Sequence, residues 1–165
     1  MNSKFNILFV CTGNTCRSPL AEMILKKILK EKKIDFVEVK SAGVSTFNGF
    51  PASFYAKESA KSYGVDLSNH VSRSLSYEVL KKADLVLAMS EEQIDQIRKI
   101  DKDSVEKTYL FKSFPEKTHK KTDSLKDPMG KELKDYHFCF REIDLSIKKI
   151  FPELIKLAQK KISSK

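Results

Sequence analysis

The 165-residue sequence contains no long run of apolar residues. Its first apolar run, residues 5–10, is too short for the core of a secretory signal peptide and far too short for a membrane span. No later run is long enough for either role. We therefore expect a cytoplasmic protein without a membrane partner, folded where thiols stay reduced.

Cysteine is also scarce, with three residues in the whole chain. An odd and small number of cysteines does not suit a disulfide framework. Structural zinc needs four cysteine or histidine ligands at characteristic spacing, and the three histidines do not complete such a pattern. We expect neither a bound metal nor a disulfide scaffold. The residues concerned are Cys11, Cys16, Cys139, His70, His119 and His137.

Acidic residues are too few to balance the basic ones, and the net charge is +9 from 31 basic and 22 acidic residues. The excess is mostly lysine dispersed over predicted helices, which is typical of a solvated surface. A positive surface also attracts anionic partners such as phosphorylated proteins. Because the sequence has no stripe of arginine and aromatic residues, we expect no nucleic-acid partner.

Strand-like and helix-like segments alternate along the chain without a repeat or a domain boundary. The predicted strands cover residues 5–10, 36–40, 84–89 and 108–111, and predicted helices cover residues 52–63, 77–82, 91–100 and 132–162. Another helix begins after Ser18, a good N-cap, with Pro19 in the first helical position. Apolar residues at spacings of three and four predict one buried face on the last helix, at residues 136, 140, 143, 147, 150, 154 and 158. Pro152 predicts a kink or a break in the same helix. The alternation implies a parallel sheet covered on both faces, which binds ligands beyond the carboxyl ends of its strands.

Residues 11–19 are the most informative segment, because they join the first predicted strand to the helix that follows it. A tight loop at a helix N-terminus turns several backbone N–H groups inward and forms an anion site. Gly13 permits close approach of the backbone, and Asn14 tolerates a positive φ better than most residues. These residue types predict a phosphate-binding loop.

The same loop carries a nucleophile and a cation. Arg17 offers a planar fork that can bind two phosphate oxygens. The positive field of such a loop favours the thiolate form of Cys11, and Ser18 could donate its hydroxyl to that thiolate or to a loop carbonyl. We interpret the segment as a site where a thiolate attacks a bound phosphoryl group.

Transfer of a phosphoryl group to sulfur also needs an acid for the leaving group and then a base for water. Asp127 lies in the long polar stretch 112–130, and loops of this length in small domains are often functional. Pro128 biases Asp127 toward an extended backbone. The simpler interpretation of Asp127 and Pro128 is a surface turn. The functional interpretation is that Asp127 is the general acid.

Residues 11–19 resemble the signature loop of the low-molecular-weight protein tyrosine phosphatases. Residues 127–128 match the late acid motif of that family, residues 41–43 match the end of its second strand, and residues 66–70 match a segment in mid-chain. The resemblance extends from Ile7 to about the middle of the last predicted helix.

The resemblance implies a single domain over residues 1–165 with a three-layer α/β fold, a doubly wound sheet of four parallel strands in the order 2-1-3-4 with helices on both faces. It also implies hydrolysis through a phosphocysteine, with Cys11 as nucleophile, Arg17 binding the phosphate and the transition state, and Asp127 as acid and then base. Phosphorylated proteins would be the substrates, and phosphate or other oxyanions the ligands. No cofactor would be needed, and the protein would be a monomer.

Further roles implied by the family concern the loop itself. Cys16 corresponds to a second loop cysteine that can pair with the nucleophile under oxidation and so protect it. The implied phosphate-binding residues are Thr12, Gly13, Asn14, Thr15, Cys16, Arg17 and Ser18. The implied loop-supporting network consists of Asn14, Ser18, Ser41 and His70.

Two positions bear on the substrate. Thr15 lies where many members that act on phosphotyrosine carry an apolar residue, and Met129 lies where they carry an aromatic one. The loop with Thr15 resembles the bacterial protein arginine phosphatase branch, although that branch tends to have Phe-Gly-Gly where this chain has residues 129–131. A threonine hydroxyl could orient a guanidinium and narrow the pocket against a flat ring. We favour phosphoarginine, with phosphotyrosine as the alternative.

Two other functional classes share parts of this pattern. Thioredoxin-coupled arsenate reductases have a similar loop, but they need two more cysteines near the end of the third strand, where residues 88–91 contain none. We expect Cys139 to lie far from the loop, without a thiol neighbour. A flavin-binding module could use residues 12–15 as a flavodoxin-like phosphate loop. Cys11 and Arg17 would then have no role, and the chain lacks tryptophan and a clear pair of stacking aromatics.

Overall fold

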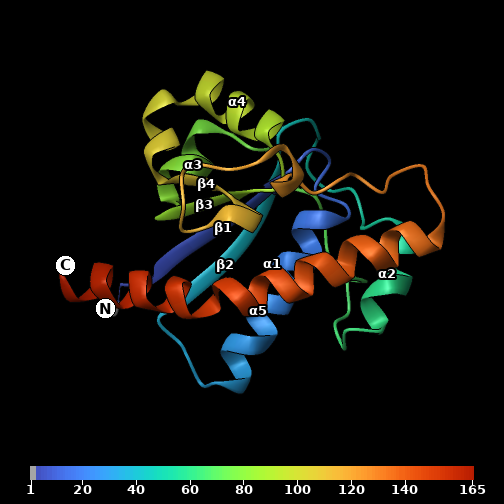
Figure 1. The fold of residues 1–165 in the computed structure, drawn as a ribbon, viewed down its shortest axis with the longest axis horizontal. Helices are drawn as coiled ribbons and strands as arrows, with labels where there is room; N and C mark the ends of the chain where they lie inside the picture. The colour runs from blue at the N-terminus through green and yellow to red at the C-terminus, as the bar shows by residue number, and fades with distance from the viewer. Residues whose placement is uncertain (1–2) are drawn as a thin grey trace.

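A parallel sheet of four strands lies at the centre of the molecule, in the order β2-β1-β3-β4 (Figure 1). The computed structural model describes residues 3–165. The strands are β1 (Phe5–Cys11), β2 (Val37–Gly43), β3 (Leu85–Ala88) and β4 (Thr108–Leu110). Every pair of neighbouring strands is parallel, so the sequence-based prediction of the fold and of its strand order is confirmed.

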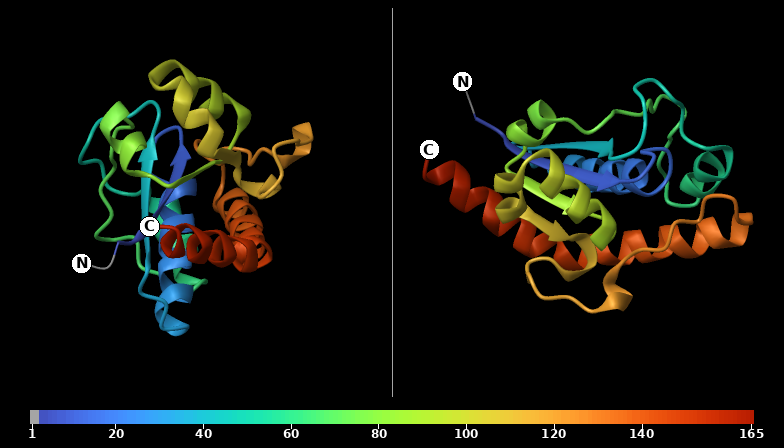
Figure 2. Two further views of the ribbon diagram at one scale, coloured as in Figure 1. Left: turned by 90° about the vertical axis from the view of Figure 1, so that its left-hand side faces the viewer. Right: turned by 90° about the horizontal axis from the view of Figure 1, so that it is seen from above.

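Helices cover both faces of the sheet (Figure 2). The helices are α1 (Arg17–Glu31), α2 (Phe54–Lys61), α3 (Tyr77–Lys82), α4 (Glu91–Ile100) and α5 (Leu133–Ser163). α1 and α5 pack on one face, and α2 joins that layer by packing against α5. α3 and α4 lie on the opposite face. These layers are the three predicted from the alternation of elements.

The side chains of β1 alternate between the two hydrophobic cores. Phe5, Ile7 and Phe9 belong to the core beneath α1 and α5. Leu8 and Val10 belong to the smaller core beneath α3 and α4. A strand buried on both faces has no polar side for water, which explains the continuous apolar run in the sequence. β1 is therefore the central strand that positions the loop that follows it.

α1 begins two residues earlier than the sequence suggests. Its N-cap is Cys16 and its first residue is Arg17, so the prediction of Ser18 as N-cap is wrong. The Ser18 hydroxyl is instead bonded to side chains of the preceding loop. Pro19 still lies in the first turn, where its missing N–H leaves no hydrogen bond unmade.

α5 runs without interruption through Pro152, so the predicted break is wrong. Proline removes the hydrogen bond to the carbonyl of Lys148 but leaves the flanking side chains in place. Ile150 and Leu154, on either side of it, are buried against the core. The apolar face predicted for this helix is confirmed, because all seven of its members are buried: Tyr136, Phe140, Ile143, Ile147, Ile150, Leu154 and Ala158.

The other boundaries agree closely with prediction. α3 and α4 have the predicted bounds, and α2 is shorter at both ends than predicted, with Ser53 as N-cap. The polar stretch 112–130 contains only short 3₁₀ turns and returns to the sheet, where Leu125 N–H donates to the carbonyl of Met89 at 2.8 Å. Within residues 3–165, no helix has the length and apolar character needed to cross a membrane.

Candidate active site

The loop that carries the cysteine motif leaves the carboxyl end of β1, between the ends of β2 and β3. Backbone N–H groups of Val44 and Ser45 donate to the carbonyl oxygens of Cys11 and Thr12, both at 3.0 Å. Asn14 has a φ of 54°, the left-handed conformation expected for it. The loop therefore lies at the edge of the sheet where the alternation of elements predicts a ligand.

The glycine that this loop requires sterically is Gly43 at the end of β2, rather than Gly13. A Cβ atom at Gly43 would lie 2.6 Å from the carbonyl oxygen of Thr12 and 3.0 Å from the backbone nitrogen of Asn14. A Cβ atom at Gly13 would make ordinary contacts, the shortest being 3.6 Å to Thr15 Oγ1. A second close backbone approach, that of β2 against the loop, therefore depends on Gly43.

Two hydrogen-bond donors surround the buried sulfur atom of Cys11. The backbone nitrogen of Asn14 lies 3.2 Å from Sγ, and the hydroxyl oxygen of Ser18 lies 2.8 Å from it. Asn14 Nδ2 donates to Ser18 Oγ at 2.8 Å, so the single hydroxyl proton of Ser18 is free to point at the sulfur. Hydrogen bonds donated to a sulfur atom favour its anionic form.

The side chain of Asn14 fixes this arrangement. Its Oδ1 accepts the backbone N–H of Arg73 at 2.9 Å, and this sets the orientation of the amide because a backbone nitrogen can only donate. Nδ2 then faces Ser18 and Ser41, the latter at 2.9 Å. His70 Nε2 lies 2.7 Å from the carbonyl oxygen of Asn14. The structure thus brings together all four residues of the implied loop-supporting network.

The network continues to Glu22 on α1, a residue that the sequence analysis missed. The hydroxyl of Ser41 accepts from Asn14 and donates its own proton to the carboxylate of Glu22. Lys26, one turn further along α1, donates to the same carboxylate at 2.6 Å. Glu22 follows Ser18 by four residues, so the two side chains share a helix face. The spacing from Ser18 is the sequence signal that could have identified Glu22. The hydrogen-bond partner of Glu22, Ser41, lies on β2 and is not predictable from local pattern.

Arg17 is buried, with 4% of its side chain exposed, and its guanidinium contacts three groups. Nη1 donates to the carbonyl oxygen of Leu125 at 2.9 Å, and Nη2 donates to Thr12 Oγ1 at 3.4 Å. Nη2 also lies 3.5 Å from Oδ2 of Asp127, whose side chain is 41% exposed. The structure therefore places the predicted acid beside the predicted phosphate-binding arginine.

A cavity opens beside Arg17 at this edge of the sheet. The cysteine loop, the start of α4 and the segment around Asp127 contribute to its walls, which include Thr12, Arg17, Ser90, Gln93, Ser124 and Asp127. Gln93 is a second residue that the sequence analysis missed, because nothing in its local pattern distinguishes it from a capping residue. Within residues 3–165, no group of three or more His, Cys, Asp or Glu side chains has the geometry to hold a metal ion.

The three cysteines lie closer together than the sequence suggests. Burial raises the pKa of the Cys16 thiol well above its usual value, and the nearby Cys139 raises it further. Burial also raises the pKa of Cys139 to about 12, and its Sγ lies 3.8 Å from the carbonyl oxygen of Lys126. The expectation that Cys139 is remote from the loop is therefore wrong. α5 packs against α1, and this long-range contact carries Cys139 to the loop.

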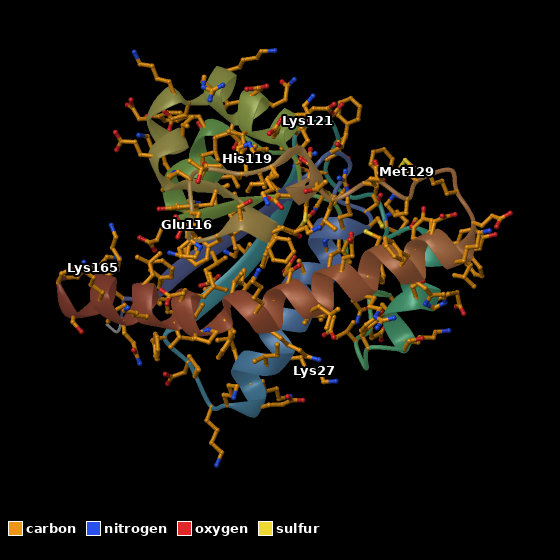
Figure 3. The ribbon with its side chains drawn as sticks, viewed as in Figure 1. Lys27, Glu116, His119, Lys121, Met129 and Lys165 are labelled. Atoms are coloured by element: carbon orange, nitrogen blue, oxygen red, sulfur yellow. The ribbon has the colours of Figure 1, made fainter. Side chains whose placement is uncertain are left out.

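Thr15 and Met129, the two positions that bear on substrate choice, both lie close to Gly13. A Cβ atom at Gly13 would lie 3.6 Å from Thr15 Oγ1 and 3.8 Å from Met129 Cε. Met129 is 55% exposed and lies on the segment that leads into α5, where Figure 3 labels it. The backbone of Thr15 accepts the N–H of Ser53 at 3.0 Å, which joins the loop to the start of α2.

Comparison with known proteins agrees with this geometry. The family model described as low molecular weight phosphotyrosine protein phosphatase matches residues 6–161. The chain belongs to this family. It is therefore a cysteine-dependent protein phosphatase, and the expectation drawn from the signature loop is confirmed.

Relatives of two kinds are similar to the chain. Etp of Escherichia coli (strain K12), a low molecular weight protein-tyrosine-phosphatase, is 40% identical over 134 residues, covering 77% of this chain and 87% of Etp. The protein-arginine-phosphatase of Geobacillus stearothermophilus is 36% identical over 150 residues, covering 91% of this chain and 96% of that protein. Sequence similarity alone does not separate the two substrate classes.

A solved structure of the YwlE arginine phosphatase, a cysteine-to-serine mutant with a phosphorylated active-site serine, has the same fold. Its TM-score is 0.84 at 32% sequence identity, and the match covers 92% of this chain and 97% of that chain.

Replacement of Gly43 tests the steric constraint on the loop. In Gly43→Ala the new methyl group meets backbone atoms that cannot move aside, so we expect the free energy of unfolding to fall by about 1–3 kcal/mol, measured by urea titration. The matched control is Gly13→Ala, whose methyl group has room and should change that free energy by less than about 1 kcal/mol. Equal stability of the two variants would contradict the assignment.

Proposed function

We propose that this phosphatase removes phosphoryl groups from protein side chains through a phosphocysteine on Cys11, with phosphoarginine as its preferred substrate. The observation that carries the mechanism is the convergence of the Asn14 N–H and the Ser18 hydroxyl on Cys11 Sγ, next to the pair formed by Arg17 and Asp127. The adjacent cavity is lined by the cation Arg17, the acid Asp127 and Thr12, the residue that directly follows the nucleophile Cys11.

In the first step the thiolate of Cys11 attacks phosphorus. A sulfur–phosphorus bond forms while the bond from phosphorus to the leaving nitrogen or oxygen breaks, and Asp127 gives its proton to the leaving atom. The fork of Arg17 and the loop N–H groups bind the phosphoryl oxygens as charge develops on them.

In the second step Asp127, now a carboxylate, takes a proton from water. The resulting oxygen nucleophile attacks phosphorus, the sulfur–phosphorus bond breaks, and phosphate leaves while Cys11 returns to the thiolate. Asp127 is suited to both steps because it is partly exposed and reaches the cavity beside Arg17. Hydrogen bonds donated by Asn14 and Ser18 stabilise the departing sulfur anion in this step.

Support for the nucleophile also comes from the YwlE mutant, in which a serine replacing a cysteine is the phosphorylated residue. The preference for phosphoarginine rests on Thr15, whose hydroxyl lies close to Gly13 of the phosphate-binding loop. A hydroxyl there can accept a hydrogen bond from a guanidinium, which a phenyl ring cannot offer.

Phosphotyrosine is the second candidate, and Met129 is the observation that favours it. A flexible, exposed thioether can contact the edge of an aromatic ring. Three further properties stay predictions. They are the monomeric state, the location in the cytoplasm, and the formation of a Cys11–Cys16 pair under oxidation.

The covalent step is tested by Cys11→Ser. We expect turnover of a phosphopeptide to be abolished, because a serine hydroxyl is a far weaker nucleophile than a thiolate, while binding of inorganic phosphate persists. Turnover is measured by phosphate release and binding by calorimetry. Cys139→Ser serves as the control, since that thiol has no role in the two steps and its variant should keep most of the activity. Substantial turnover by Cys11→Ser would exclude the covalent mechanism.

Asp127→Asn tests the acid. Loss of a general acid should lower kcat by about 10²–10⁴, and the loss should be larger for phenyl phosphate than for para-nitrophenyl phosphate, whose leaving group needs less protonation. Asp95→Asn, which alters an exposed carboxylate on α4 paired with Arg98, should leave kcat unchanged. A uniform loss for both substrates would assign Asp127 a different role.

Thr15→Ile tests substrate preference. The wild-type protein should hydrolyse a phosphoarginine peptide more efficiently than a phosphotyrosine peptide of the same sequence. The substituted protein should shift toward phosphotyrosine, because it loses the hydroxyl and gains an apolar wall. The measurement is the ratio of kcat/KM values for the two peptides. An identical ratio in both proteins would remove the role given to Thr15, and a wild-type preference for phosphotyrosine would establish the alternative.

A further inference from the structure

The hydroxyl group of Thr12 accepts two hydrogen bonds, one from an amide and one from a guanidinium. Gln93 Nε2 donates to Thr12 Oγ1 at 3.2 Å, and Arg17 Nη2 donates to it at 3.4 Å. Neither donor group can accept a hydrogen bond. The two lone pairs of the hydroxyl oxygen are therefore engaged, and its single proton must point elsewhere.

The orientation of Gln93 is fixed by its other end. Its Oε1 accepts the backbone N–H of Ser90 at 2.6 Å, and a backbone nitrogen can only donate. The amide nitrogen must therefore be the atom that faces Thr12. Gln93 is 1% exposed, so its amide is held in this orientation by the surrounding structure.

The proton of Thr12 has no acceptor in the part of the chain that the structure describes, residues 3–165. Thr12 lines the cavity that also contains Arg17 and Asp127. The remaining direction for its proton is this cavity, where the proposed mechanism places the phosphoryl oxygens. A buried or half-buried donor gains most from an acceptor that is charged.

We propose that Thr12 is a substrate-contacting residue, whose side-chain hydroxyl donates to an oxygen of the bound phosphoryl group, and that Gln93 is the positioning residue that turns this proton toward the substrate. The inference rests on the proposed function, since it needs an oxyanion in the loop. It adds a side-chain donor from Thr12 to the backbone donors of the loop, and it gives α4 a part in the site.

The test is a double-mutant cycle with Thr12→Val and Gln93→Glu. Thr12→Val keeps the shape of the side chain and removes the hydroxyl. We expect it to lower kcat/KM for para-nitrophenyl phosphate, and to weaken competitive inhibition by inorganic phosphate, by about 10- to 100-fold, the effect of a hydrogen bond to a charged group. Thr12→Ser keeps the hydroxyl and should restore most of both values.

Gln93→Glu keeps an acceptor for the N–H of Ser90 but replaces the donor that faces Thr12 with an acceptor. The Thr12 proton then turns to the new carboxylate and away from the phosphoryl group. Phosphate inhibition should weaken strongly when Gln93→Glu is made alone and clearly less when it is added to Thr12→Val, because the redirected hydroxyl is then absent. The added negative charge acts in both backgrounds and cancels in the comparison.

Several outcomes would overturn the inference. Additive effects of the two substitutions would show that Gln93 does not act through Thr12. Unchanged phosphate inhibition in Thr12→Val, or equal losses in Thr12→Val and Thr12→Ser, would show that the hydroxyl does not contact the ligand, and this comparison decides the matter even if Gln93→Glu does not fold. A wild-type protein that is not inhibited by phosphate would overturn the proposed function as well, whereas additivity in an active enzyme overturns this inference alone.

Discussion

The buried amide of Asn14 is the constraint on which the rest of the site depends. Asn14 has a positive φ, its side-chain amide contacts the hydroxyls of Ser18 and Ser41 and the backbone N–H of Arg73, and its backbone carbonyl oxygen contacts His70. The polar atoms of the fully buried Asn14 side chain would be costly to leave without a partner. The loop, α1, the end of β2 and the segment before α3 must therefore meet at one residue. The fold is built to satisfy this amide, and the satisfied amide in turn directs the Ser18 proton to the nucleophilic sulfur.

Hydrogen-bond polarity distinguishes one cysteine from the other two. The sulfur of Cys11 faces N–H and O–H donors, which favour a thiolate. Cys139 faces the carbonyl oxygen of Lys126, an acceptor, which favours a protonated thiol, and burial raises its pKa to about 12. Burial likewise raises the pKa of Cys16. Three thiols thus share one region of the core, but within residues 3–165 only the sulfur of Cys11 has both an N–H and an O–H donor beside it.

Sequence reasoning succeeded where local pattern and family resemblance agree. It failed where the position or role of a residue depends on a partner far away in the sequence. The strand order and the buried face of α5 follow from periodicity and resemblance, and both are confirmed. Ser18 was assigned as an N-cap from local preference, but hydrogen bonds to the loop determine its place. Glu22 and Gln93 have no distinctive local pattern, because their partners Ser41 and Thr12 lie on other elements. Long-range packing of α5 likewise brings Cys139 near the loop, against expectation.

The length of the segment before α5 follows from the strand order. β4 is the edge strand, so the chain that leaves it must cross the end of β3 to bring Asp127 to the end of β1. Two hydrogen bonds fix that path at Leu125, whose N–H donates to Met89 beyond β3 and whose carbonyl accepts from Arg17. The guanidinium that faces the phosphate site therefore also positions the segment that carries the acid. Arginine suits this double task because its planar fork offers donors in two directions, whereas a lysine would supply a single charged point.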